Sequence, residues 1–219
     1  MTTTKTNEQA FECLIEKALV GTTREERGET ADIDKQQPEG GMFYWGLPKD
    51  MDPKTAIDRR RLWSFLHATQ QQELDKYVGT QMEKEVEKCI DQDIRTFGII
   101  HVMKNSVKVQ NLELRLFFPR PTAADSEASK EKYAANQFSV TRQQTYSLLN
   151  PGNEIDMVIF VNGLPLMTFE LKNPWTHQTA AYDGQKQYKE NRSPKDTIFN
   201  FGRCLAPVSY THLTLPTIA

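Results

Sequence analysis

The first third of the chain carries apolar residues at helical spacing. Residues 6–21 hold such a stripe, and Gly21 is a typical helix stop, so this stretch predicts a helix. Residues 55–78 and 80–97 show the same spacing and predict further helices. Residues 22–54 lie between them and are poor in core residues and rich in Gly, Pro and charge, so they predict a long connection. The stripe of the first helix consists of Phe11, Leu14, Ile15, Ala18 and Leu19.

The pattern then changes to the period of strands. Residues 112–116 alternate between leucine and charged residues, and residues 138–146 also have the composition of a strand. Two apolar runs meet at Asn162-Gly163, which is the strongest short-range signal for a β-hairpin. Residues 178–191 predict a closing helix. This order predicts an α/β fold, with a mixed central β-sheet flanked by helices.

Composition narrows the class of protein. The chain has 219 residues, of which 26% are charged, and no apolar run approaches the ~18 residues that span a bilayer, so we expect no contact with a membrane. The first residues have no apolar signal-peptide core, and the three cysteines are odd in number and far apart, which predicts reduced thiols and a cytoplasmic protein. The net charge of −2 gives no overall footprint for nucleic acid, although a local basic groove is compatible with it.

Three charged residues interrupt the apolar hairpin. Asp156 lies in its first run, and Glu170 and Lys172 lie two residues apart in the second, where a strand places them on one face. Mg²⁺ takes one or two protein carboxylates and leaves room for water and phosphate oxygens. The two acids, with the backbone carbonyl of Leu171, are therefore candidate magnesium ligands. Lys172 would lie beside the metal and could orient a water molecule or neutralise charge that develops on phosphorus.

The register of the hairpin decides whether these residues can form one site. With a regular two-residue turn, residue 161 pairs with residue 164, and Asp156 then faces Phe169, so that Glu170 points to the other side of the sheet. A shared site requires an irregularity between residues 156 and 170. We expect a three-residue loop over residues 161–163 with a left-handed Gly163, although Asn-Gly suits the regular turn as well.

The spacing of the acids resembles a known nuclease motif. Asp156, thirteen intervening residues and then Glu-Leu-Lys resemble the PD-(D/E)xK signature. The stretches YAANQFSVTRQQTYS, VIFVNGLPLMTFELKNP, QYKENRSP and FNFGRCLA are similar to the N-terminal region of the restriction (R) subunit of type I restriction-modification enzymes. The resemblance covers roughly residues 55–206 and is densest from Tyr133 to Ala206.

This resemblance implies a fold and a function. The fold would be a PD-(D/E)xK restriction-endonuclease-like core, and the activity that of a Mg²⁺-dependent endodeoxyribonuclease cutting double-stranded DNA. In the complete subunit an ATP-dependent motor would follow, and the partners would be methyltransferase and specificity subunits. The chain has no GxxxxGK[ST] loop, so we expect a fragment or an isolated domain that binds no ATP itself. By position, Asp156 and Glu170 would be metal ligands and Lys172 the catalytic lysine. Tyr188 fits a supporting tyrosine on the next helix, where Gln185 and Gln187 compete for the supporting glutamine.

Other positions complete the sequence-based hypotheses. Glu8 and Glu12 on the first helix are candidates for a third acid. The candidate contacts to the DNA backbone are Lys186, Lys189, Arg192, Lys195 and Arg203. We expect three regions: residues 1–54 as a helix and connection, residues 55–206 as the endonuclease domain, and residues 207–219 as a non-native or truncated tail. The composition changes abruptly there, and the alternative interpretation of these residues is an ordinary C-terminal strand. Two alternatives remain, a stand-alone nuclease of repair or defence and a catalytically inactive docking domain.

Overall fold

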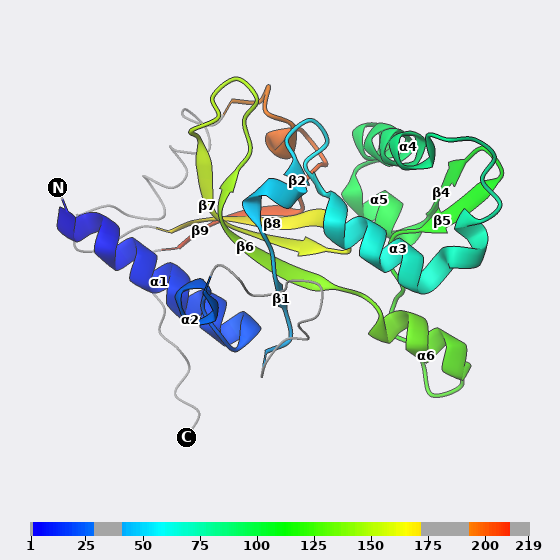
Figure 1. Ribbon diagram of the computed structural model, residues 1–219, viewed down its shortest axis with the longest axis horizontal. Coiled ribbons are helices and arrows are strands. Elements are labelled where there is room, and N and C mark those ends of the chain that lie inside the picture. The colour runs from blue at the N-terminus through cyan, green and yellow to red at the C-terminus, as the bar shows by residue number, and fades with distance from the viewer. Residues whose placement is uncertain (1, 29–40, 172–192, 211–219) are drawn as a thin grey trace.

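A five-stranded mixed sheet forms the centre of the protein (Figure 1). The computed structural model describes residues 2–28, 41–171 and 193–210, and the side chains of residues 9–28, 41–171 and 193–205 among them. The three central strands are antiparallel, and the short β1 and the strand β9 add to the two edges in parallel orientation. The predicted α/β class with a mixed sheet is confirmed. In spatial order the strands are β1 (Tyr44–Trp45), β6 (Phe138–Thr145), β7 (Glu154–Val161), β8 (Leu164–Leu171) and β9 (Ala206–Tyr210).

The long helix α1 (Thr2–Val20) covers one face of this sheet. Its apolar side chains pack with Met157 and Ile159 of β7 and with Phe169 of β8. The short α2 (Arg24–Arg27) follows α1 and lies beside it (Figure 1). The predicted first helix is thus confirmed, and residues 2–28 belong to the same packed unit as the sheet.

The other face of the sheet is covered by short elements. Val158 and Phe160 of β7 pack with Ala56 and with Ile198 of the 3-10 turn η5 (Thr197–Phe199). A two-stranded ribbon of β2 (Met51–Asp52) and β3 (Ile57–Asp58) follows the 3-10 turn η1 (Pro48–Asp50) on the same side. The expected connection over residues 22–54 therefore contains several ordered elements in its described part.

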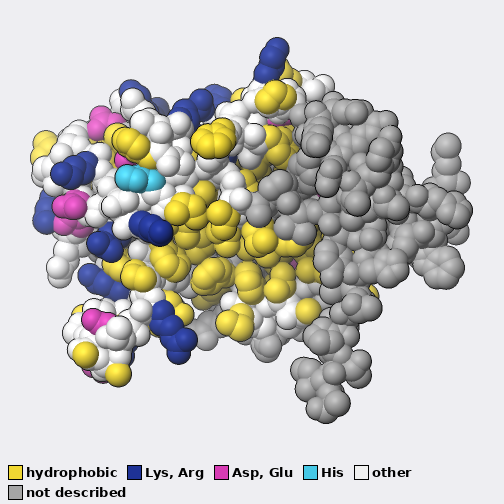
Figure 2. Space-filling model, turned by 180° about the vertical axis from the view of Figure 1, so that it is seen from behind, with side chains coloured by type: hydrophobic (Ala, Val, Ile, Leu, Met, Phe, Trp, Pro, Cys, Tyr) yellow, Lys and Arg dark blue, Asp and Glu magenta, His cyan; other side chains and the backbone are white. Residues whose placement is uncertain are grey.

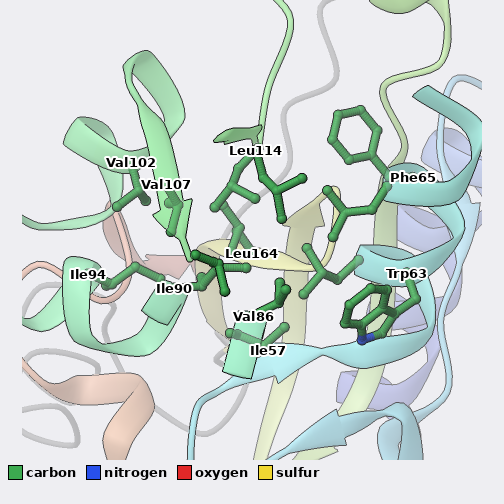
Figure 3. Packing of buried hydrophobic residues seen from close by; sticks show 14 of the residues in the cluster. Ile57, Trp63, Phe65, Val86, Ile90, Ile94, Val102, Val107, Leu114 and Leu164 are labelled. Carbon is green, nitrogen blue, oxygen red and sulfur yellow. The ribbon is translucent and has the colours of Figure 1, made fainter. Parts of the chain in front are cut away.

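A second core lies beyond the tip of the β7–β8 hairpin. Figure 3 shows its apolar side chains converging from several helices and strands, with Leu164 of β8 reaching in from the hairpin. The predicted helices over residues 55–78 and 80–97 correspond to its first two helices. Its elements are α3 (Arg59–Leu74), α4 (Met82–Phe97), α5 (Ile99–Lys104), β4 (Ser106–Val109) and β5 (Leu112–Arg115). The peripheral helix α6 (Glu127–Ala134) connects this unit to β6.

Helix α3 is kinked where its side chains meet the edge of β5. Gln70 has non-helical φ and ψ of −143° and 28°. Its amide pairs with the backbone of Arg115, donating to the carbonyl oxygen over 2.8 Å and accepting from the N–H over 2.7 Å. One turn later, Glu73 accepts a hydrogen bond from the N–H of Glu113. The outer edge of β5 is therefore bonded to side chains of a helix.

The hairpin has a regular turn and a bulge further along. Val161 pairs with Leu164 across Asn162 and Gly163, whose φ values are 49° and 81°. The expected three-residue loop is wrong. The register shifts between Ile159 and Phe160, and one extra residue of β8, Leu166, has no opposite partner. The irregularity that a shared site requires is therefore present, but it is a bulge within the strand.

The turn is fixed by what surrounds it. The fully buried Asn162 donates to the carbonyl oxygen of Leu116 over 2.9 Å and accepts from the N–H of Gln137 over 2.7 Å. Gly163 touches the start of α3, and a Cβ there would lie 2.3 Å from the carbonyl oxygen of Asp58. Asn162 and Gly163 thus fix the hairpin tip against neighbouring segments, and this fixes the pairing of the residues next to the turn.

The end of the described chain departs from expectation. Residues 206–210 form β9, which pairs with β8 over its whole length, including Glu170 with Ser209. The strand thus continues past the expected boundary at residue 206, as in the alternative of a C-terminal strand, and the non-native origin of residues 207–219 stays a prediction. Residues 211–219 lie outside the described residues. Within the described ranges, no helix combines the length and the apolar character that a membrane span needs.

Candidate functional site

The two candidate carboxylates lie opposite each other in the hairpin. Met157 pairs with Phe169, so the next step of the same register sets Asp156 against Glu170. Directly opposed residues of an antiparallel pair project to the same side of the sheet and have Cβ atoms about 4.5–5.5 Å apart. The register therefore gives the two acids one face, the face opposite to the one that α1 covers.

The two acids differ in their surroundings. Glu170 is fully buried, whereas Asp156 is partly exposed and its Oδ2 accepts a hydrogen bond of 2.6 Å from the N–H of Leu171. That bond ties the carboxylate of β7 to the last residue of β8. Buried carboxylates need compensating partners, and two that face each other are stabilised by a shared cation. The pair thus combines a rigid inner acid with an outer acid that solvent can reach.

The donor set fits a hard divalent cation. Two carboxylates and the carbonyl oxygen of Leu171 are all oxygen donors, and Mg²⁺ typically uses few protein ligands and keeps several waters. Within the described residues, no group of three or more His, Cys, Asp or Glu side chains could hold a metal ion. A site here would therefore depend on the hairpin acids together with water and substrate oxygens.

Most of the other predicted site residues fall outside the described part of the chain. These are Lys172, Gln185, Gln187, Tyr188, Lys186, Lys189 and Arg192. The described Lys195 is exposed, and its backbone N–H bonds to Ser193. Arg203, in contrast, is buried, pairs with Asp91 and donates to the carbonyl oxygen of Thr55. Its proposed contact with DNA is therefore wrong, since the guanidinium is buried and bonded to groups of the protein.

The candidate third acid Glu12 belongs to a buried ion-pair network. Its Oε2 lies 3.1 Å from Nε of Arg142, and Oε2 of Glu16 lies 3.0 Å from Nη1 of the same arginine. Arg142 pairs with Met157 in the sheet, so these contacts lie on the face that α1 covers. They give Glu12 a structural role, and its role as a metal ligand stays a prediction. The side chain of Glu8 lies outside the described residues.

Sequence reasoning missed this network, because Arg142 lies in the largely polar strand β6, where an arginine is not conspicuous. Glu25 of α2 also contacts Arg142, at 3.0 Å. Burial opposes ionisation of Glu25, but hydrogen bonds from its own backbone N–H and from Arg142 outweigh it and lower its pKa to about 2. Burial likewise disfavours the charged form of Arg142, yet its bonds to Glu16, Glu12 and Glu25 raise its pKa above the usual value. The charges thus fasten α1 and α2 to the sheet.

A second buried acid lies at the hairpin tip. Asp58 caps α3 by accepting from the N–H of Arg61 over 3.0 Å, and its own N–H donates to the carbonyl oxygen of Gly163 over 2.9 Å. Burial raises the pKa of this carboxyl to about 6. Arg61 extends back to the carbonyl oxygen of Trp45 and lies over the ring of Tyr44. This cluster holds the turn, and it is separated from Asp156 by most of the length of β7.

Figure 2 shows the charge on one face of the molecule. Lys and Arg side chains are mixed with Asp and Glu side chains over the part that carries α3 to α5, and hydrophobic side chains gather in the middle of this face. The described residues of this face thus form no single basic stripe, in agreement with the net charge of −2.

The chain was compared with known proteins. A family model described as the type I restriction enzyme R protein N terminus matches residues 54–211, which is more than half of the chain. The match includes both hairpin acids. The comparison with curated proteins found no match, and neither did the comparison with solved structures.

Proposed function

The chain belongs to the type I restriction enzyme R protein N-terminus family, and from this premise we propose that it is a Mg²⁺-dependent DNA endonuclease domain. The observation that carries the proposal is the register of the β7–β8 hairpin. The bulge at Leu166 sets Asp156 and Glu170 opposite each other, where two strands of a regular hairpin with the same turn would have separated them. The mixed sheet with flanking helices is compatible with a restriction-endonuclease-like core.

Each residue of the hairpin has a distinct task in this proposal. Glu170, fixed by complete burial, and Asp156, oriented by the N–H of Leu171, hold Mg²⁺ together with the carbonyl oxygen of Leu171. The bound cation supplies Lewis-acid polarisation of a phosphate oxygen and an acidified water. Lys172 offsets negative charge that develops on the phosphorus oxygens, and the supporting roles go to Tyr188 with Gln185 or Gln187 on the following helix.

The partners follow from the family. The substrate is double-stranded DNA, and the assembled enzyme adds methyltransferase and specificity subunits and an ATP-dependent motor in the complete R subunit. Lys186, Lys189, Arg192 and the exposed Lys195 are the proposed contacts to the DNA backbone, which position the duplex without selecting a sequence. Sequence recognition therefore belongs to the partner subunits.

Cation binding tests the site directly. We expect calorimetric titration of Mg²⁺ or Ca²⁺ into this chain to give one site, which Asp156→Asn and Glu170→Gln each weaken at least tenfold. Glu131→Gln is the matched control, because Glu131 is an exposed carboxylate on α6, outside the β7–β8 hairpin. The variants should remain folded, since removal of one of two facing carboxylates relieves repulsion in the metal-free protein.

Cleavage tests the activity in the assembled enzyme. With ATP and Mg²⁺, the substitutions Asp156→Ala, Glu170→Ala and Lys172→Ala in the complete R subunit should each abolish nicking and double-strand cleavage of a plasmid that carries a recognition site. Wild-type cleavage by one of these variants would remove that residue from the site. Failure of the unaltered chain to bind any divalent cation would favour the inactive docking domain.

A further inference from the structure

Gln143 has a backbone conformation that is unusual for its position. Its φ is 51°, in the left-handed region. The other described non-glycine residues with positive φ lie in connections between strands: Ala56 between β2 and β3, Gln110 between β4 and β5, and Asn162 between β7 and β8. Gln143 alone among them lies inside a strand, β6. Such strain persists where the surrounding structure imposes it, and it clusters at functional sites.

The register places Gln143 beside the candidate site. Arg142 pairs with Met157 and Gln144 pairs with Ile155, so the position opposite Gln143 is Asp156. The ladder has no bridge between these two residues, as expected when one of them is left-handed. Gln143, Asp156 and Glu170 therefore form a row across three neighbouring strands, with Asp156 in the middle.

The side chain of Gln143 is not explained by the fold. It is partly exposed, and its amide has no hydrogen-bond partner among the described residues. The neighbouring side chains differ in this respect, because Arg142 is bound by glutamates and Gln144 donates to the carbonyl oxygen of Pro48. Glycine would adopt the same backbone conformation without a steric penalty. The chain therefore tolerates a strained backbone at Gln143 in order to carry a polar amide that the packing of the fold does not require.

We propose that Gln143 binds the DNA backbone at this site, with its amide N–H donating to a non-bridging oxygen of the phosphodiester next to Asp156. The inference rests on the proposed function. The carboxylates and the amide have different roles because of their chemistry. Carboxylates are the preferred ligands of Mg²⁺ and repel phosphate, whereas the amide of Gln143 offers phosphate a neutral hydrogen-bond donor. Glutamine side chains are common donors to phosphates in protein–DNA complexes.

The test compares two glutamines of the same backbone conformation in this chain. Gln143→Gly removes the amide and the strain together, and Gln110→Gly does the same in the β4–β5 turn, where φ is 53°. Gln143→Gly should keep the melting temperature of the unaltered chain or exceed it. Gln110→Gly relieves the same strain but also loses the exposed hydrogen bond of 2.7 Å from the Gln110 amide to Glu85, so its melting temperature should stay near that of the unaltered chain. A third variant, Gln143→Glu, keeps the size of the side chain and places a negative charge against the phosphate.

Binding of a fluorescently labelled duplex is measured by anisotropy in Ca²⁺, which takes the same oxygen ligands as Mg²⁺. We expect Gln143→Gly to weaken DNA binding about tenfold, as for loss of a hydrogen bond to a charged group, and Gln143→Glu to weaken it further. Ca²⁺ affinity should stay within about twofold for Gln143→Gly, and Gln110→Gly should change neither affinity.

Two outcomes overturn the inference: DNA binding by Gln143→Gly equal to that by Gln110→Gly, or no DNA binding by the unaltered chain. Failure of the proposed function can be distinguished from failure of this inference. In that case the chain would not bind Ca²⁺, or Asp156→Asn would leave the Ca²⁺ affinity unchanged. A loss of Ca²⁺ affinity in Gln143→Gly equal to its loss of DNA affinity would also refute a phosphate contact, because the amide would then act on the cation.

Discussion

Replacement of Gly163 by alanine probes how firmly the hairpin tip is held. The new Cβ would lie 2.3 Å from the carbonyl oxygen of Asp58 and 2.7 Å from the backbone nitrogen of Leu62. Both atoms are backbone at the start of α3, so neither can rotate away. The left-handed φ of 81° adds about 1–2 kcal/mol for any residue with a Cβ, and forced overlap in a packed region adds about 1–3 kcal/mol. The expected loss is therefore about 2–5 kcal/mol.

Urea and thermal unfolding measure this loss. For a domain of this size, each kcal/mol corresponds to a decrease in Tm of about 2–4 °C, so Gly163→Ala should lower the Tm by roughly 4–20 °C. Gly28→Ala is the matched control, because Gly28 also has a positive φ, 75°, but a Cβ there would meet nothing within 4 Å. Its ψ of 170° lies in a region almost reserved for glycine, so its conformational penalty is no smaller.

The difference between the two variants isolates the contact with α3. If Gly163→Ala destabilises the protein no more than Gly28→Ala does, the tip of the hairpin is free to move away from α3. The register of β7 and β8 would then not be anchored at the turn, and the turn would not help the bulge at Leu166 to set Asp156 against Glu170.

Three further predictions concern stability. Arg142→Met should cost about 3–5 kcal/mol in urea unfolding, because it removes the buried arginine that pairs with Glu12 and Glu16, and an unchanged midpoint would mean that α1 is not held by this network. Asp58, with a pKa of about 6 in the folded protein against about 4 when unfolded, binds more protons when folded, so it makes stability fall as pH rises from about 4 to 6. Asp58→Asn should remove that decrease, and the same decrease in wild type and variant would assign it to other groups. Truncation after Leu205 removes β9 and should lower the Tm by more than about 4 °C, whereas an unchanged Tm would mean that β9 adds nothing to the sheet.

The sequence predicts those parts of the fold in which one side of an element is apolar. Helices α1, α3 and α4 follow from stripes at helical spacing, and the Asn162-Gly163 turn follows from its two residue types. The hydrophobic pattern does not locate the bulge, because the residues of β8 around Leu166 are apolar on both faces of the strand. Their alternation therefore does not show which residue faces which side. Strand β9 was only the less favoured interpretation of the C-terminal residues, because a short edge strand needs little hydrophobicity.

The candidate site was predictable only as far as local spacing reaches. Charged residues inside apolar strands pointed to Asp156 and Glu170. Arg142 lies in the more polar strand β6, and its partners on α1 lie 126 and 130 residues away, a separation that no local pattern reveals. The left-handed Gln143 was also invisible, since glutamine carries no preference for that conformation and only the tertiary structure imposes it.

The amide of Gln70 has a consequence for how this protein meets other copies of itself. A two-stranded ribbon such as β4–β5 normally leaves unpaired N–H and C=O groups that invite a strand from another molecule. In this protein the groups of Arg115 and the N–H of Glu113 are already bonded to Gln70 and Glu73. The kinked helix α3 thus takes the place of a neighbouring strand along β5, which protects this edge of the ribbon from edge-to-edge aggregation.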